Sequence, residues 1–311
     1  MTTTQETTRP PQRLDDVPGW FPVLDQVLFD WFLSRQEASG TRGDLLEVGV
    51  YMGKSAIFTG RHLQPGESFT VCDLFEGDAP DDANRAESTK SYGKLTRRIF
   101  EENYLAFHDA LPRVLQGPSS VVPGEVAPGS CRFVHVDASH LYEHVHGDIR
   151  AARDLLLPDG IVVLDDFRSE HTPGVSIATW EAVLNGELHP ICISTQKLYG
   201  TWGDPGPVQE ELIEMVRGRT DCHLSMQEAA GHRIIRLKSK GMRAPEFPPS
   251  RYADAPDAPE APGPTSAPAA PVTPGSAGSA GSVPRRRSRV RRVAVDLLPP
   301  VLTRALRRAM R

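Results

Sequence analysis

The chain has 311 residues, 39% of them hydrophobic, and a formal net charge of -5. Residues 285–311 contain ten arginines and a single acid, Asp296, so the rest of the chain is strongly acidic. That balance argues against a nucleic-acid groove in the folded part. No stretch approaches the roughly 18 apolar residues of a membrane span, and the N-terminus has no apolar signal region. Together with four cysteines that form no CxxC pair, this predicts a cytoplasmic protein.

Composition divides the chain into four segments. We predict a disordered N-terminus over 1–16, one folded domain over 17–243, a disordered Pro/Ala/Gly/Ser-rich linker over 244–284 and a basic amphipathic segment over 285–311. Apolar residues alternate with arginines in the last segment, a pattern typical of binding to an anionic membrane surface or an acidic partner. Such docking would place the protein at the inner face of a membrane. The sequence leaves homo-oligomer formation undecided.

Helical and strand-like patterns alternate along the folded segment. Helices are expected over 20–36, 54–62, 95–107, 141–157 and 175–184, and strands over 44–50, 68–73, 132–137, 160–165, 191–194, 197–202 and 232–237. This alternation predicts an α/β fold: a Rossmann-like, doubly wound, mostly parallel seven-stranded sheet with helices on both faces. The stretch 110–130, rich in Pro and Gly, gives no readable element.

The segment Glu-Val-Gly-Val-Tyr-Met-Gly-Lys-Ser, residues 47–55, follows the first predicted strand. A P-loop has four residues between its first glycine and Gly-Lys-Ser, whereas only three separate Gly49 from Gly53, and no dinucleotide fingerprint is present. The segment is similar to the E/D-x-G-x-x-x-G opening of class I methyltransferases. In that family the acid and glycines lie against the methionine part of S-adenosylmethionine. The resemblance implies cofactor contacts for Glu47, Gly49, Gly53 and Ser55; a purely structural turn is the alternative.

An acid also ends the second predicted strand, where Val-Cys-Asp73 lies 26 residues after Glu47. In doubly wound folds an acid at this place, about 20 residues after the glycine turn, accepts hydrogen bonds from ribose hydroxyls. Asp73 is therefore predicted to bind the cofactor ribose, although a simple strand-end cap would use the same residue.

Two further apolar strands end in acids, the first in Asp137 and the second in Asp165 and Asp166. Ligands of open α/β sheets bind beyond the carboxyl ends of the strands, and neighbouring strands are about 4.8 Å apart. The three carboxylates would converge if these strands are neighbours, and would raise one another's pKa unless a cation lies between them. Oxygen ligands of this kind suit Mg²⁺. The alternative is that these acids are solvated loop residues or helix caps.

The sequence around these acids resembles a narrower family. Phe-Val-His-Val-Asp137-Ala-Ser-His140-x-Tyr142, followed by Asp148 and by Gly-Ile-Val-Val-Leu-Asp165-Asp166, looks like the metal-dependent small-molecule O-methyltransferases. The most similar groups are the macrolide-sugar O-methyltransferases and the cephalosporin-biosynthesis methyltransferase-like proteins, over about 20–202. The resemblance implies that Asp137, Asp165 and Asp166 hold Mg²⁺ and that His140 is the general base, although some members have an acid near that place.

The function implied is a S-adenosylmethionine-dependent, Mg²⁺-dependent O-methyltransferase that acts on a hydroxyl of a sugar or other polyhydroxylated, natural-product-type small molecule. A histidine with a pKa near neutrality can take the hydroxyl proton. The alternative is a catalytically silent cofactor-binding scaffold or partner subunit, tethered by its basic tail. The clustered carboxylates favour the enzyme, because a scaffold has no need of them.

Four other histidines and one loop complete these expectations. His135 is expected in the core, His144 and His146 on a helix surface without a role, and His171 in the lining of the acceptor pocket. The polar loop 76–92 is expected either to close over the cofactor or to be a plain insertion.

Overall fold

The computed structural model describes residues 10–86 and 95–253. The chain divides into two units, Met1–Pro256 and Asp257–Arg311, and every described residue belongs to the first. The predictions for 254–284 and for the basic segment 285–311 therefore lie outside the described residues. Within those residues, no helix is both long and apolar enough to cross a membrane.

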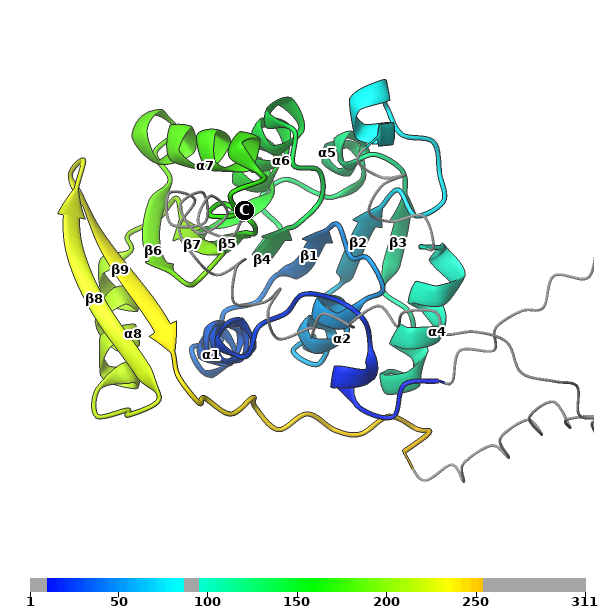
Figure 1. Ribbon diagram of the computed structural model, residues 1–311, viewed down its shortest axis with the longest axis horizontal. Coiled ribbons are helices and arrows are strands. Elements are labelled where there is room, and N and C mark those ends of the chain that lie inside the picture. Colours follow the sequence, from blue (N-terminus) through cyan, green and yellow to red (C-terminus); the bar gives the residue numbers. More distant parts are fainter. Residues whose placement is uncertain (1–9, 87–94, 254–311) are drawn as a thin grey trace, which may run out of the picture. The chain divides into compact units, whose positions relative to one another are not determined.

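The described residues form a nine-stranded sheet in the order β3-β2-β1-β4-β5-β7-β6-β9-β8 (Figure 1). The first five strands are parallel, and β7 is antiparallel to both β5 and β6. The chain starts at β1 in the centre, winds outward to β3, and then crosses to β4 on the other side, which makes the fold doubly wound. The strands are β1 Asp44–Val48, β2 Phe69–Asp73, β3 Arg113–Gln116, β4 Cys131–Val136, β5 Leu156–Leu164, β6 His189–Ile193, β7 Leu198–Thr201, β8 Cys222–Ala229 and β9 His232–Ser239.

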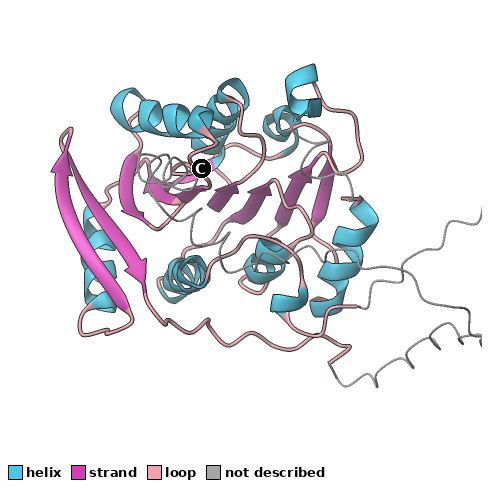
Figure 2. Cartoon of the chain, in the orientation of Figure 1, coloured by secondary structure: helices cyan, strands magenta, loops and turns pink. Residues whose placement is uncertain are grey.

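Helices cover both faces of the sheet (Figures 1 and 2). Side chains of α1, α2, α4 and α8 share one hydrophobic core with one face, and those of α5, α6 and α7 share a second core with the other. The helices are η1 Leu14–Asp16, α1 Val23–Ala38, α2 Lys54–Gly60, α4 Arg97–Phe107, η2 Ser119–Val121, α5 Val122–Glu125, α6 Tyr142–Leu155, α7 Pro173–Asn185 and α8 Gly206–Val216.

Alternate residues of the central strands contribute to opposite cores. Leu45 packs in the core beneath α1 and α2, while its neighbour Leu46 packs in the core beneath α6. All six residues of β4 are buried. Because both faces of a parallel sheet are covered, its strands are apolar throughout, which is why they were readable from the sequence.

The fold class is as predicted, but the strand count was wrong: nine strands are present, not seven. Seven of them form the doubly wound sheet, and β8 and β9 add an antiparallel hairpin through a single bridge from Ile193 to Arg236. The unreadable stretch 110–130 contains β3, η2 and α5. β3 has only four residues and begins and ends with the polar Arg113 and Gln116, so its apolar signal is weak.

The folded domain also extends beyond the predicted 17–243 at both ends. Leu14 of η1 is buried, so this part of the N-terminus is ordered. Past residue 243, Phe247 stacks on Phe58 of α2 with ring centroids 5.5 Å apart. Ser250 N donates to Gln12 O (2.9 Å), and Arg251 N donates to Ala106 O (2.9 Å). One aromatic anchor and these backbone hydrogen bonds are enough to order a segment whose composition suggests a linker.

Candidate active site

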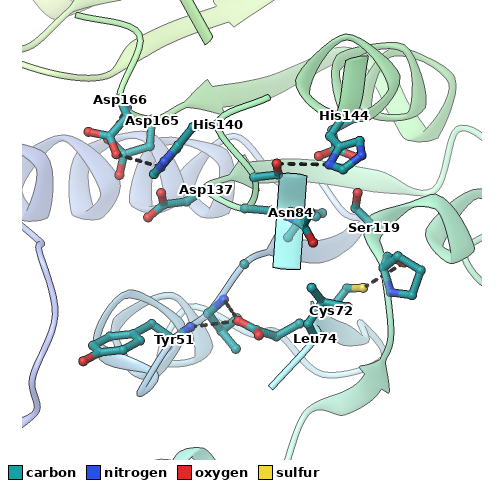
Figure 3. A pocket seen from close by; sticks show the side chains of 18 of the residues that line it. Tyr51, Cys72, Leu74, Asn84, Ser119, Asp137, His140, His144, Asp165 and Asp166 are labelled. Atoms are coloured by element: carbon teal, nitrogen blue, oxygen red, sulfur yellow. Dashed lines mark hydrogen bonds and ion pairs between the residues drawn. The ribbon is translucent and has the colours of Figure 1, made fainter. Parts of the chain in front are cut away.

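A cavity of about 960 Å³ lies at the carboxyl ends of the parallel strands. Its two ends are seen in Figure 3: the acids after β4 and β5 with His140 lie at one, and Cys72 and Ser119 lie at the other. This is the switch point of a doubly wound sheet, where strands on either side of β1 and β4 lead away from each other and leave a crevice.

The glycine turn after β1 is shaped by two left-handed glycines. Gly49 has φ +84°, and a Cβ on it would lie 2.0 Å from the carbonyl oxygen of Asp137. Gly53 has φ +94°, precedes α2, and a Cβ there would meet the ring of Phe100 at 3.0 Å. Gly49 lines the cavity, whereas Gly53 is not in its lining. At both positions the backbone conformation and the close neighbours require glycine. The backbone of Gly49 also forms part of the cavity wall.

Glu47 lies beneath the cavity and not in its lining. Its side chain is fully buried, accepts a hydrogen bond from Ser55 Oγ, and has Oε1 3.0 Å from Nδ1 of His135. Burial raises the pKa of Glu47 to about 8, so the neutral acid is favoured at neutral pH. Glu47 was predicted to contact the cofactor, but its side chain does not line the cavity. Its hydrogen-bond partner Ser55 does.

Asp73 lines the cavity and stabilises the glycine turn by hydrogen bonds. One carboxylate oxygen accepts from the backbone N–H groups of Val50 (2.8 Å) and Tyr51 (3.0 Å), and the other accepts from Phe75 N (2.8 Å). Burial raises the pKa of Asp73, and these three hydrogen bonds oppose that rise. The acid thus couples the end of β2 to the turn after β1, and it faces the space where a ribose was predicted.

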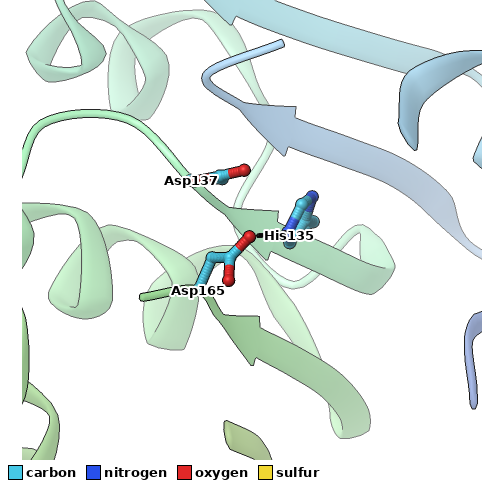
Figure 4. A group of neighbouring side chains, drawn as sticks. All are labelled: His135, Asp137 and Asp165. Atoms are coloured by element: carbon cyan, nitrogen blue, oxygen red, sulfur yellow. Dashed lines mark ion pairs between the residues drawn. The ribbon is translucent and has the colours of Figure 1, made fainter. Parts of the chain in front are cut away.

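The acids that end β4 and β5 converge, as predicted for neighbouring strands. β4 and β5 pair in parallel. The backbone hydrogen bonds continue just past the strand ends, where Asp137 N donates to Val48 O of β1 (2.7 Å) and Asp165 N donates to Val136 O of β4 (3.0 Å). Ligand atoms of His135, Asp137 and Asp165 all lie within 4.8 Å of one another (Figure 4). Burial raises the pKa of Asp137, and the nearby Lys197 opposes that rise.

Asp137 is not a helix cap. The residue at the N-cap of α6 is Leu141, whose N–H donates to Ser139 Oγ at 3.2 Å. Within 10–86 and 95–253, no hydrogen-bond donor to the Asp137 carboxylate is found. Its oxygens therefore face the cavity without a protein partner from these ranges.

His140 and Asp166 are in contact at the same end of the cavity, with Nε2 3.3 Å from Oδ2 (Figure 3). Asp166 adopts a left-handed backbone, φ +55°, and its other oxygen accepts from Ser169 Oγ at 2.7 Å. Burial alone would raise the pKa of Asp166, but the hydrogen bonds from His140 and Ser169 lower it below its ordinary value. His171 also lines the cavity, with its ring 6.1 Å from that of His140.

One buried cation was missed by the sequence analysis. Lys197 precedes β7, its side chain is 1% exposed, and its Nζ donates to Asp165 Oδ2. The same Nζ lies 3.2 Å from Nε2 of His135, which is buried in the core as predicted. The signal in the sequence was weak, because a lysine at the start of a short strand is usually solvent-exposed.

His144, expected on the surface of α6 without a role, connects two loops at the cavity. Its Nδ1 lies 3.0 Å from Ser139 Oγ, and its Nε2 forms an ion pair with Asp81 Oδ2 at 2.9 Å. The described part of loop 76–92 contributes Glu76, Gly77, Pro80 and Asn84 to the lining of the cavity. His146 is 40% exposed and does not line it.

Residues 46–167 match the family model described as a methyltransferase domain. This region of the chain is a methyltransferase domain. It includes the glycine turn, Asp73, and the acids after β4 and β5, and the strand order around it is that of a Rossmann-like methyltransferase fold. Most of the residues that line the cavity fall within this methyltransferase domain.

Solved structures of methyltransferases are also similar to the chain. The O-methyltransferase NovP is 17% identical, with 58% of this chain and 79% of NovP covered and a TM-score of 0.49. The calicheamicin methyltransferase CalS11 is 20% identical, with 58% and 79% covered and a TM-score of 0.43. TomG from Streptomyces achromogenes, involved in tomaymycin synthesis, is 19% identical, with 71% and 79% covered and a TM-score of 0.32. Among curated proteins, none matches the sequence.

Proposed function

We propose that this methyltransferase transfers the methyl group of S-adenosylmethionine to a hydroxyl oxygen of a sugar or another polyhydroxylated small molecule of natural-product type. The observation that carries the proposal is the contact between His140 and Asp166 beside the carboxylate of Asp137, at one end of the cavity that the glycine turn lines. A base next to a cofactor site suits methylation of a hydroxyl, and clustered oxygen ligands suit a cation that would assist it.

His140 is the proposed general base. When it accepts the hydroxyl proton it becomes an imidazolium, and the carboxylate of Asp166 stabilises that charge and orients the ring. The acceptor oxygen then attacks the methyl carbon in line as the bond to sulfur breaks. The protein contributes mainly alignment, since the acids of β4 and β5 and the glycine turn of β1 are fixed to one another by the sheet.

The residues at this end of the cavity fit a divalent cation. Asp137 presents oxygens that no described residue binds. Burial raises the pKa of Asp137, and the nearby negative charge of Asp166 raises it further. Oxygen ligands of this kind suit Mg²⁺, which Asp137, Asp165 and Asp166 would hold. When bound, Mg²⁺ supplies positive charge that lowers the pKa of an acceptor hydroxyl.

Cofactor contacts are proposed for residues that line the cavity near the turn. Gly49 offers backbone, Ser55 offers a hydroxyl, and Asp73 offers carboxylate oxygens for ribose hydroxyls. Glu47 and Gly53 act indirectly: Glu47 accepts a hydrogen bond from Ser55, and Gly53 lets the turn pass over Phe100.

The proposal is tested by transfer of labelled methyl from S-adenosylmethionine to a panel of glycosylated metabolites, with Mg²⁺ and with a chelator. His140→Gln should lower the rate by about 10²–10⁴-fold while cofactor affinity is retained. His146→Gln, the same change on the exposed side of α6, is the matched control and should leave the rate unchanged. Full activity of His140→Gln would contradict its role as base, and full activity in the chelator would contradict the role of Mg²⁺.

The partner of the basic segment 285–311 is a second part of the proposal. Ten arginines among apolar residues support docking on an anionic membrane surface, at the inner face if the enzyme is cytoplasmic. The full chain should co-sediment with phosphatidylserine vesicles and not with phosphatidylcholine vesicles. Replacing the six arginines at 285–287, 289, 291 and 292 with glutamine should abolish this binding; binding to an acidic protein alone would contradict it.

A further inference from the structure

Trp20 is a solvent-exposed indole in the lining of the cavity. Its side chain is 73% exposed, more than any other large hydrophobic residue in the described part of the chain. The residues on either side of it, Val17 and Phe21, are buried in the core, so the backbone that carries Trp20 is anchored. A single exposed apolar side chain needs no explanation, but this one lies at a ligand-sized cavity and has an aromatic neighbour.

The neighbour of Trp20 is Tyr51, in the glycine turn. The centroids of the two rings are 5.6 Å apart, and their planes make an angle of 33°. Tyr51 also lines the cavity, and Figure 3 shows it on the side where Asp137 and His140 lie, away from Cys72. Trp20 and Tyr51 therefore form an aromatic wall on the side of the cavity that holds the proposed base.

The backbone of Tyr51 has a conformation that favours glycine. Its φ is +48°, in the left-handed region, where a residue with a Cβ is disfavoured. The hydrogen bond from Tyr51 N to Asp73 Oδ2 (3.0 Å) helps to hold this conformation. Backbone strain of this kind persists where the surrounding structure enforces it, and it clusters at ligand sites. A tyrosine at this position therefore indicates a use for its ring.

The cavity has room for an acceptor beside the cofactor. Its volume of about 960 Å³ lies at the upper end of the range of about 300–1,000 Å³ that is usual for ligand pockets. A hydroxylated ring has weakly polar faces and carries its hydroxyls at the rim. Such a ring can bury one face against an aromatic side chain while a hydroxyl at its rim reaches His140. An open-chain polyol has no flat face to bury.

We propose that the aromatic wall, Trp20 and Tyr51, binds the ring of the acceptor by stacking, and thereby selects hydroxylated rings over open-chain polyols. The ring that stacks is either the sugar itself or an aryl group attached to it, since both have a flat and weakly polar face. This inference rests on the proposed function, because it concerns the acceptor of the same reaction. The wall determines specificity, and the proton transfer remains with His140.

The experiment measures binding of small probes to the full chain by saturation-transfer NMR, with S-adenosylhomocysteine present. The probes are methyl glycosides of hexoses and 6-deoxyhexoses, the phenyl glycosides of the same sugars, and the corresponding open-chain alditols. Trp20→Ala should weaken binding of the glycosides by about threefold to tenfold, which is the range of one aromatic stacking contact. An effect on the methyl glycosides assigns the stack to the sugar ring, and an effect confined to the phenyl glycosides assigns it to the aryl ring.

Two further variants control for the loss of the indole. Trp20→Phe keeps a ring at the wall and should keep the affinity within about threefold of wild type. Trp180→Ala removes a partly exposed indole of α7 that does not line the cavity, and it should change no probe affinity. Affinity for S-adenosylhomocysteine should stay within about twofold in all variants. For any glycoside that is methylated, Trp20→Ala should raise KM and leave kcat within about twofold, because stacking is the same in the ground and transition states.

Three results would overturn the inference: equal binding of glycosides and alditols to wild type, unchanged glycoside affinity in Trp20→Ala, or no binding of any probe to wild type. If Trp20→Ala fails to fold by circular dichroism, Tyr51→Leu, which removes the other ring of the wall, decides the question. Binding that depends on Trp20 without any methyl transfer would contradict the proposed function and support the wall. Methyl transfer with an unchanged KM in Trp20→Ala would contradict the wall and support the proposed function.

Discussion

Replacement of Gly49 by alanine tests whether the close approach of β1 and β4 holds the site together. The new Cβ would lie 2.0 Å from the Asp137 carbonyl oxygen and 2.7 Å from Ala138 Cα, so backbone must move. Gly66 is a matched control, because its φ of +88° is close to the +84° of Gly49 but nothing lies within 4 Å of its Cβ position. Both changes incur the cost of a left-handed alanine, about 1–2 kcal/mol.

Only Gly49→Ala adds the cost of overpacking, about 1–3 kcal/mol or more. We therefore expect a loss of unfolding free energy of about 2–5 kcal/mol for Gly49→Ala and about 1–2 kcal/mol for Gly66→Ala. Urea denaturation measures both, and calorimetric titration with S-adenosylmethionine should show weaker binding for Gly49→Ala only. Equal destabilisation by the two variants, or unchanged cofactor affinity in Gly49→Ala, would refute the reasoning.

Two further predictions concern buried charges. Arg132 is fully buried and binds both carboxylate oxygens of Glu67, at 3.0 and 2.9 Å. Arg132→Met should lower the unfolding free energy measured by urea denaturation by about 3–5 kcal/mol, whereas Arg219→Met, in the partly exposed pair with Asp221, should lower it by at most about 1 kcal/mol. Similar losses in the two variants would contradict this prediction. The folded state holds the proton of Glu47 more tightly than the unfolded chain does, because its pKa is raised from 4.5 to about 8. Stability should therefore fall as pH rises through this range, by about 4 kcal/mol relative to Glu47→Gln, and parallel pH profiles of the two proteins would exclude the effect.

The central strands and the acids at their ends could be predicted from the sequence, because the pattern that indicates each of them is local. An apolar run followed by Asp137, and another followed by Asp165, show both the strand and the point where it leaves the core. Their pairing then follows from the doubly wound topology. Elements near the sheet edges were harder to predict: β3 is short with polar ends, and half of β8 is exposed, so neither has a continuous apolar run.

The contacts that distinguish the acids from one another could not be predicted. Lys197 is 32 residues from Asp165 in sequence and 60 from Asp137, and only the pairing of β7 with β5 brings it to them. The place of Glu47 was also not readable, since the residue that precedes a glycine turn can point into the cavity or into the core. In this fold it points to His135, whose own burial was predicted correctly.

The added hairpin changes how the sheet meets other molecules. Without it, β6, with four buried residues of its five, would be an apolar edge with unpaired backbone groups, which is a template for aggregation. β9 lies against that edge, and the strand that becomes the new edge, β8, exposes polar residues such as Gln227 and Glu228. At the opposite edge, β3 is four residues long, and its Arg113 pairs with Glu125. Both edges of the sheet are therefore poor sites for the addition of a strand from another chain.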